Sequence, residues 1–182
     1  MQRKAWPTYI WLGLLMLGTL LGILGLFGPV CWHPNAYLMH NAGDGLKAYA
    51  ALEYYLRYQD WSLWHEGMQY PFGNYLLFVD LNPLLALLLH PVNQVVPLAE
   101  YTRGVVNVSM MLAFFPAAWA WWHLFRKMAL PPLWAVLGAW LLLFLSPQIQ
   151  RLIAHFSLSY SFFIPVCWLF ILKLIHQSSS WK

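Results

Sequence analysis

All six carboxylates of this chain lie between residues 44 and 100, and the flanks of that segment are long apolar runs whose only charges are basic. The first run, residues 9–30, contains no charged side chain. About twenty apolar residues in a helix are enough to cross ~30 Å of hydrocarbon. The distribution of charge therefore predicts a membrane protein that holds one polar segment against a bilayer.

The composition excludes an ordinary soluble domain. Of the 182 residues, 61% are hydrophobic, 18% are aromatic and 9% are charged, whereas about a quarter of an average soluble chain is charged. The net charge of +4 does not indicate nucleic acid, because the basic residues lie where membrane anchors and anionic head groups would use them. Membrane lipids are therefore the expected partners, and no nucleic acid is expected.

The expected fold is all-α, a polytopic membrane protein that forms one integral membrane domain over residues 1–182. Four spans are predicted, at about residues 9–30, 104–125, 130–147 and 156–175. Arg3 and Lys4 before the first span place the N-terminus in the cytoplasm. A signal peptide fits less well, because the apolar run is too long and no small-residue cleavage site follows it. Residues 31–103 then form a long outer loop.

Residues 75–98 are ambiguous, because they are apolar enough to cross a membrane but contain three prolines, which interrupt helices. If this segment crosses, Arg126 and Lys127 lie outside. If it lies in the membrane interface, the pair is cytoplasmic together with Arg3 and Lys4. The positive-inside rule favours the second alternative.

The outer loop contains a pattern typical of an amphipathic helix over residues 46–59. Glu53 and Arg57 form an i, i+4 pair in the favourable order. Apolar side chains share one side of this helix: Tyr49, Leu52, Tyr55 and Leu56. The pattern predicts a helix that lies on the membrane surface. Residues 70–73 read as a turn, with proline second and glycine fourth.

Asp44 is the sharpest candidate for chemistry, because glycines flank it on both sides. They leave its carboxylate unshielded and allow unusual backbone angles, which suits a general base that meets a substrate hydroxyl. The alternative is an N-cap for the helix that starts at Leu46. Both roles are compatible.

Asp80 follows five apolar residues and precedes Asn82 and Pro83, so it is expected at the membrane surface. A carboxylate at that depth needs a partner. Three roles remain open: a second acid that holds a divalent cation with Asp44, an ion pair with Lys47 or Arg103, and an Asx-turn before the proline.

Two further cationic candidates lie on the short outer connection between the third and fourth spans. Arg151 carries a guanidinium fork suited to a lipid phosphate, and His155 could protonate a leaving phosphate. The alternative is an interfacial arginine that snorkels and a structural histidine. With Lys47 and Arg103, these residues form the predicted set for binding a lipid phosphate.

The order of these features resembles the GT-C glycosyltransferases, membrane enzymes that use polyprenyl-phosphate sugars, and in particular bacterial members of that superfamily. The resemblance covers most of the chain. It rests on residues 43–49, which contain the Gly-Asp-Gly motif, and on residues 68–73, 80–84, 146–148 and 155–158. The topology adds to it: a cytoplasmic N-terminus, one span and then a long outer loop.

The resemblance implies an inverting sugar transfer at the outer face of a bacterial inner membrane, with Asp44 as the general base. The donor would be a lipid-linked sugar whose phosphate meets basic residues, and Asp80 would stand where such enzymes place a metal-binding or structural acid. A divalent cation, Mg²⁺ or Mn²⁺, is the cofactor that this arrangement allows. The second outer loop lacks the acid that many relatives carry, so the metal requirement is left open.

The chain is also short for this superfamily, whose members commonly have eight or more spans. The resemblance therefore implies the N-terminal part of an enzyme, to be completed by further transmembrane segments or a partner subunit. The alternative function is a non-catalytic membrane module that binds lipid or a partner protein through the same loop. That module would tolerate neutral substitutions of Asp44 and Asp80.

Overall fold

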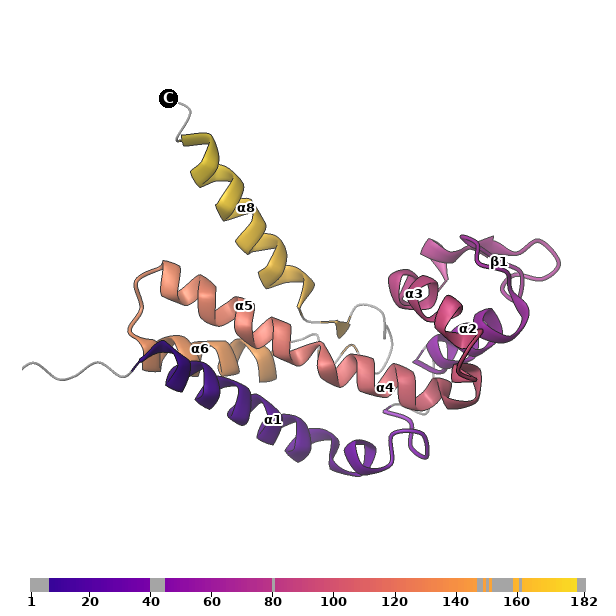
Figure 1. Cartoon of the computed structure of the whole chain (residues 1–182), viewed down its shortest axis with the longest axis horizontal. Coiled ribbons are helices and arrows are strands. Elements are labelled where there is room, and N and C mark those ends of the chain that lie inside the picture. The colour runs from indigo at the N-terminus through magenta and orange to yellow at the C-terminus, as the bar shows by residue number, and fades with distance from the viewer. Residues whose placement is uncertain are drawn as a thin grey trace, which may run out of the picture. The chain divides into compact units, whose positions relative to one another are not determined.

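The structure is a computed structural model, and it describes residues 7–39, 45–79, 81–146, 149, 151, 159, 160 and 162–179. The described chain is mostly helical, which confirms the all-α expectation (Figure 1). It divides into two compact units. Unit 1 comprises Met1–Leu26, Met111–Ile149 and Tyr160–Lys182, and unit 2 comprises Phe27–Met110 and Gln150–Ser159.

Unit 1 is built from α5 (Phe114–Lys127), α6 (Pro132–Phe144), α8 (Phe163–Ser179) and most of α1 (Thr8–Trp32). α1 continues into unit 2 across a kink at Phe27, where φ is −120° and ψ is 21°. Pro29 lies two residues later, and its ring and missing N–H disturb the preceding helical turn. The kink therefore falls where one unit ends and the next begins.

Glycines on α1 allow α6 to pack closely against it. A Cβ atom at Gly18 would lie 2.0 Å from the Trp140 ring, and one at Gly22 would lie 2.2 Å from the Phe144 ring. The Trp140 indole also donates a hydrogen bond to the Leu15 carbonyl at 3.1 Å. Small residues at these two positions thus permit the close approach of the two helices.

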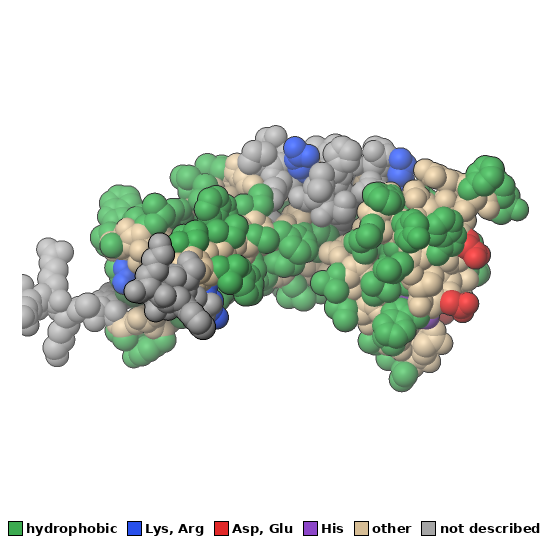
Figure 2. Space-filling model, turned by 90° about the horizontal axis from the view of Figure 1, so that it is seen from above, with side chains coloured by type: hydrophobic (Ala, Val, Ile, Leu, Met, Phe, Trp, Pro, Cys, Tyr) green, Lys and Arg blue, Asp and Glu red, His purple; other side chains and the backbone are tan. Residues whose placement is uncertain are grey.

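Within the described part of the chain, two helical segments are long and apolar enough to cross a membrane: Thr8–Trp32 and Leu98–Lys127. Of the most apolar stretch of the first segment, only 17% is buried inside the structure, and α1 exposes leucines at positions 14, 17, 20, 21 and 26. On the face shown in Figure 2, hydrophobic side chains cover much of the described surface. A helix that is apolar on all sides yet mostly uncovered is typical of a membrane span.

The expected third and fourth spans are represented by shorter helices. α6 has 13 residues and α8 has 17, whereas about 20 are needed to cross the hydrocarbon core. Pro131 and Pro132 limit α6 at its start, because proline favours the first helical position. The topology with four spans therefore stays a prediction, while two segments of crossing length are observed.

In the described residues, unit 2 contains five helical elements after the end of α1, and a small β-hairpin. In chain order the elements are α2 (Gly45–Tyr58), β1 (Trp64–His65), β2 (Asn74–Tyr75), η1 (Leu76–Phe78), α3 (Pro83–Asn93), η2 (Leu98–Tyr101) and α4 (Thr102–Leu112). α3 starts at Pro83 with the Asn82 side chain accepting a hydrogen bond from the Leu85 N–H at 3.2 Å. Pro83 begins α3 and Pro97 precedes η2, so these two prolines bound short helices as expected, whereas Pro91 lies inside α3 and does not end it.

The apolar side of α2 forms the core of unit 2. Its bounds agree with the predicted helix within one residue, and Tyr49, Leu52, Tyr55 and Leu56 are all buried. The Glu53–Arg57 pair is present at 3.0 Å. The prediction that this apolar face lies on the membrane needs correction, because α3 and η2 pack against α2. The residue pattern of α2 alone does not show which other parts of the chain cover its apolar face.

The antiparallel hairpin of β1 and β2 pairs Trp64 with Tyr75 and His65 with Asn74. Its turn closes one residue earlier than predicted, since the Phe72 N–H donates to the Gln69 carbonyl at 3.0 Å. Gly73 follows with φ of +71°, a conformation that favours glycine. The hairpin and η1 expose several large apolar side chains: Tyr70, Phe72, Tyr75, Leu77 and Phe78.

Candidate functional site

A buried asparagine on α4 organises the part of unit 2 that surrounds the Gly-Asp-Gly motif. Asn107 is fully buried, and its carboxamide Oδ1 accepts a hydrogen bond from the Tyr49 hydroxyl at 2.6 Å. Its Nδ2 donates to the carbonyls of Pro34 and Tyr37, both at 2.7 Å. One side chain therefore satisfies three polar groups from two segments that are far from it in the sequence.

These two segments are the ones that flank residues 40–44. Met39 is the last described residue before the motif, and its N–H donates to the Tyr49 hydroxyl at 3.2 Å. Gly45, the last residue of the motif and the first described residue after position 44, begins α2 one turn before Tyr49. Asn35 adds a further tie, because its Oδ1 accepts from the Gly104 N–H at 3.1 Å. The chain is thus fastened to α4 immediately before and shortly after the motif.

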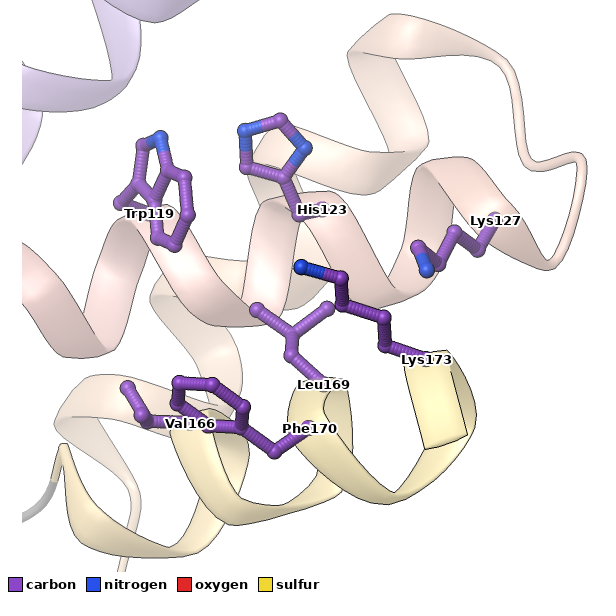
Figure 3. A pocket seen from close by; sticks show the side chains of 7 residues that line it. All are labelled: Trp119, His123, Lys127, Val166, Leu169, Phe170 and Lys173. Atoms are coloured by element: carbon purple, nitrogen blue, oxygen red, sulfur yellow. The ribbon is translucent and has the colours of Figure 1, made fainter. Parts of the chain in front are cut away.

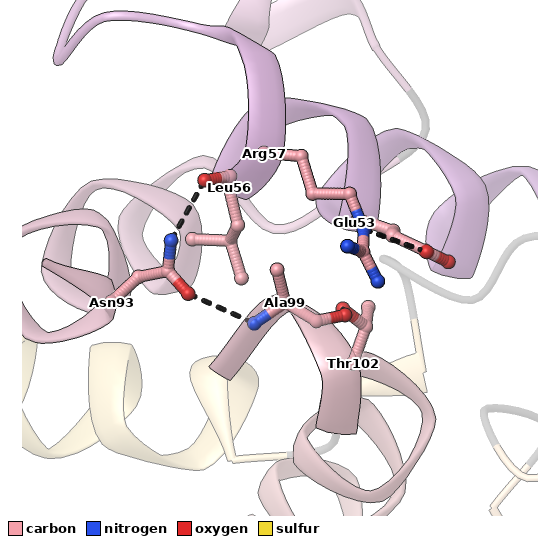
Figure 4. A network of polar contacts seen from close by, with 6 residues as sticks. All are labelled: Glu53, Leu56, Arg57, Asn93, Ala99 and Thr102. Atoms are coloured by element: carbon pink, nitrogen blue, oxygen red, sulfur yellow. Dashed lines mark hydrogen bonds and ion pairs between the residues drawn. The ribbon is translucent and has the colours of Figure 1, made fainter. Parts of the chain in front are cut away.

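The carboxyl end of α2 is fixed in a similar way by Asn93 of α3. The Asn93 Nδ2 donates to the Leu56 carbonyl at 2.8 Å, and its Oδ1 accepts from the Ala99 N–H at 2.9 Å (Figure 4). The last carbonyls of a helix have no partner within the helix, so such a donor satisfies one of them. α2 is therefore held at both ends by asparagine side chains.

A polar pocket of about 230 Å³ lies beside α2 and the start of α4. Its lining combines acidic, basic and neutral groups: Asn35, Glu53, Ala99, Glu100, Thr102 and Arg103. Carboxylates accept hydrogen bonds, guanidinium donates them, and amides and hydroxyls do both. A neutral ligand rich in hydroxyl groups can form hydrogen bonds with such a set. A phosphate group would be repelled here by the two carboxylates, Glu53 and Glu100.

The predicted site residues are distributed as follows. Arg103 lies on the first turn of α4, is exposed and lines the polar pocket. Lys47 is exposed on the first turn of α2, and Arg151 is exposed in unit 2. Asp44, Asp80 and His155 lie outside the described residues. Among the predicted site residues, Arg103 thus lines the polar pocket.

The chemistry of a metal site was also tested on the residues that are present. Among the described residues, no group of three or more histidine, cysteine, aspartate or glutamate side chains is placed to hold a metal ion. The proposed pair of metal-binding acids, Asp44 and Asp80, lies outside that part of the chain.

Sequence reasoning missed the residues that organise this site. Asn107 is a single amide within the apolar residues 104–115, and Asn93 lies between Pro91 and Pro97. A polar side chain in an otherwise apolar helix costs free energy unless it is hydrogen-bonded. This signal, which points to a partner for Asp80, is also present at Asn107 and indicates a side chain with specific hydrogen-bond partners.

The chain was compared with known families, curated proteins and solved structures. No curated protein and no solved structure matches it. One family does match, over residues 14–182, which include both compact units and the Gly-Asp-Gly motif. The chain belongs to the family described as "Domain of unknown function (DUF6311)".

Proposed function

We propose that this protein is a membrane-embedded glycosyltransferase of the GT-C type, acting on its own or as part of a larger enzyme. It would transfer a sugar from a polyprenyl-phosphate donor to an acceptor hydroxyl at the outer face of a bacterial inner membrane. Asp44 is the general base. The four-span topology, with residues 31–103 outside, is part of this proposal.

The observation that supports the proposal most is the double anchoring of the segment around Asp44. A general base must be held in position against its substrate, because misplacement by about 1 Å can cost 10²-fold in rate. Asn107 binds the chain at Pro34 and Tyr37 before the motif and at Tyr49 after it. Five residues, 40–44, separate the anchored Met39 from the start of α2.

The reaction would proceed as a single displacement. The acceptor oxygen forms a bond to the anomeric carbon of the sugar while its proton passes to the Asp44 carboxylate. The bond between that carbon and the lipid-phosphate oxygen breaks, and the phosphate leaves with the electron pair. Lys47 and Arg151 are proposed to stabilise the phosphate, with His155 as a proton donor.

The polar pocket is assigned to the hydroxyl groups of a sugar. Glu53 and Glu100 can accept hydrogen bonds from them, and Asn35 and Arg103 can donate. This assignment changes the role expected for Arg103, which would orient hydroxyl groups rather than bind the phosphate. Asp80 is proposed to support the site as a structural acid.

The proposal is tested by measuring transfer from radiolabelled polyprenyl-phosphate sugars in membranes that contain the protein. The wild type is compared with Asp44→Asn and with Asp60→Asn, a matched neutralisation of an exposed acid in unit 2. Transfer by the wild type and Asp60→Asn, with a loss of 10²–10⁴-fold or so in Asp44→Asn, would support the base assignment.

Two results would contradict the proposal. Equal transfer by Asp44→Asn and wild type would refute Asp44 as the base. Absence of transfer by inserted wild-type protein, across the sugar panel, would favour the non-catalytic membrane module, in which the same loop binds lipid or a partner protein.

A further inference from the structure

A second pocket lies within unit 1, between α5 and α8, and has a volume of about 290 Å³. α5 contributes Trp119, His123 and Lys127, and α8 contributes Val166, Leu169, Phe170 and Lys173. None of these residues belongs to the predicted site. In Figure 3 the Lys173 side chain reaches from α8 toward α5, where His123 and Lys127 lie.

The lining changes from apolar to cationic along both helices. On α5, Trp119, His123 and Lys127 follow one another at intervals of four residues, so they share one face of the helix. On α8, residues 166, 169, 170 and 173 have the same kind of helical spacing. The apolar residues come first on each helix and the lysines last, which matches the polarity of an amphiphile with one charged end.

The two lysines have no acidic partner in unit 1. All six acidic side chains of the protein lie between residues 44 and 100, and unit 1 contains none of that segment. In the described part of the chain, neither Lys127 nor Lys173 forms a salt bridge. Unit 1 therefore offers these amines no acidic side chain, and a bound anion can neutralise them.

Lys127 is also the last residue of the crossing-length segment Leu98–Lys127. In a membrane, this position places the cationic end of the pocket at the interface, where phospholipid head groups lie. Basic pockets between transmembrane helices on the cytoplasmic side are suited to anionic head groups. The expected topology puts Arg126 and Lys127 on that side, opposite the face assigned to Asp44.

We propose that the pocket between α5 and α8 binds an anionic phospholipid, with its phosphate at Lys127 and Lys173 and its hydrocarbon against Val166, Leu169 and Phe170. His123 stands between two tryptophan rings, at centroid distances of 4.4 Å from Trp119 and 4.8 Å from Trp122. This contact fixes its imidazole at the boundary between the apolar and cationic parts. The inference rests on membrane insertion but not on sugar transfer.

A simpler account of the lysines explains only one of them. Lys127 ends α5, where a cation is favoured by the helix dipole. Lys173 lies six residues before the end of α8, outside its last turn. Its position on the pocket wall is explained by a shared anionic ligand, whereas the helix dipole does not account for it.

The experiment uses the full chain in nanodiscs of equal parts phosphatidylcholine and phosphatidylglycerol. Native mass spectrometry measures how strongly phosphatidylglycerol is enriched among the lipids that stay bound. Each of Lys127→Gln and Lys173→Gln should lower this enrichment about fivefold, the factor that corresponds to ~1 kcal/mol per basic residue at an anionic surface. The double Lys→Arg variant keeps both charges and should retain it.

Arg126→Gln is the matched control. Arg126 is adjacent to Lys127 but does not line the pocket. An unchanged enrichment in this variant, together with losses in the lysine variants, supports the pocket. Equal losses in all three would overturn it, because they would show a general attraction between interfacial charge and anionic lipid.

Leu169→Trp tests the pocket without a change of charge, since the larger side chain should fill the space and reduce lipid retention. Wild-type retention in this variant would overturn the proposal even if a lysine variant failed to insert. Inorganic phosphate, added to detergent-solubilised protein, distinguishes the source of the anion. Displacement of bound phosphatidylglycerol by phosphate at equal concentration would assign the pocket to a soluble phosphate compound instead.

Discussion

Replacement of Asn107 by leucine tests whether one amide holds unit 2 together. The two side chains have similar volumes, so the change removes hydrogen bonds with little change in packing. Three groups then lose their hydrogen bond to the amide: the Tyr49 hydroxyl and the carbonyls of Pro34 and Tyr37, at present 2.6, 2.7 and 2.7 Å from it. Asn107 itself is 0% exposed, so water does not reach this position in the folded state.

The expected cost follows from counting these groups. A buried hydrogen bond contributes about 1 kcal/mol net, and a buried polar group left without a partner costs about 1–3 kcal/mol. The Tyr49 hydroxyl keeps its hydrogen bond from the Met39 N–H, so the free-energy cost at this group is smaller than at the two carbonyls. Local relaxation will lower the sum further, and about 3–5 kcal/mol of lost stability is the expected result.

Tyr49→Phe removes one of the same three bonds and supplies a comparison. The free energy of unfolding is measured by denaturant titration of protein in detergent, for both single variants and for the double variant. The losses should not add, because the two variants remove a shared bond. Hydrogen exchange should also accelerate in peptides that cover residues 34–39 and 45–49.

A loss below about 1 kcal/mol in Asn107→Leu would refute the reasoning, since it would equal no more than a single ordinary hydrogen bond. Strict additivity with Tyr49→Phe would refute the pairing of the two residues. A large loss of stability without faster exchange in residues 34–39 would place the role of Asn107 elsewhere in α4.

Two further predictions concern packing and pH. Gly18→Ala should destabilise the contact of α1 with α6 by about 1–3 kcal/mol, because the added Cβ would lie 2.0 Å from the Trp140 ring. Gly13→Ala is the control and should have no such effect, because the added Cβ would meet open space. Thermal unfolding of both variants in detergent measures the difference. Burial raises the pKa of Tyr55 above its ordinary value of 10.0, and its hydroxyl donates to the Ser62 carbonyl at 2.6 Å. The stability that this group provides is therefore complete below pH 10 and is lost as the pH rises through the folded-state pKa. Tyr55→Phe should reduce that alkaline loss, measured as the free energy of unfolding against pH, and an identical pH profile would contradict the assignment.

The features that could be predicted from the sequence are those set by local pattern. The uncharged residues 9–30 predict α1 to within two residues at each end. The 3.6-residue periodicity of residues 46–59 predicts α2. The Glu53–Arg57 pair followed from its spacing alone. In each of these cases the structure depends on residues within a few helical turns.

The partner of each apolar face could not be predicted in the same way. An amphipathic helix in a hydrophobic chain can place its apolar side on lipid or on protein, and both choices satisfy the pattern. The apolar side of α2 lies on protein because α3 is fixed against it. Asn93 of α3 bonds to the Leu56 carbonyl, and His90 of α3 bonds to the Gln59 carbonyl. These contacts join residues more than thirty positions apart.

The same distinction applies to the candidate site. Motif reasoning selects residues that could react, such as Asp44, but an isolated carboxylate is equally suited to an N-cap. A general base, the role that we propose for Asp44, needs support from the surrounding chain, and the described chain on both sides of residues 40–44 is held by Asn107, 58 residues from Tyr49 in sequence. In that proposal Asn107 would limit the motion of the segments before and after Asp44 without taking part in the reaction. If Asn107→Leu lowered sugar transfer while the rest of unit 1 and unit 2 stayed folded, the anchoring would be shown to serve catalysis; if transfer persisted, it would serve stability alone.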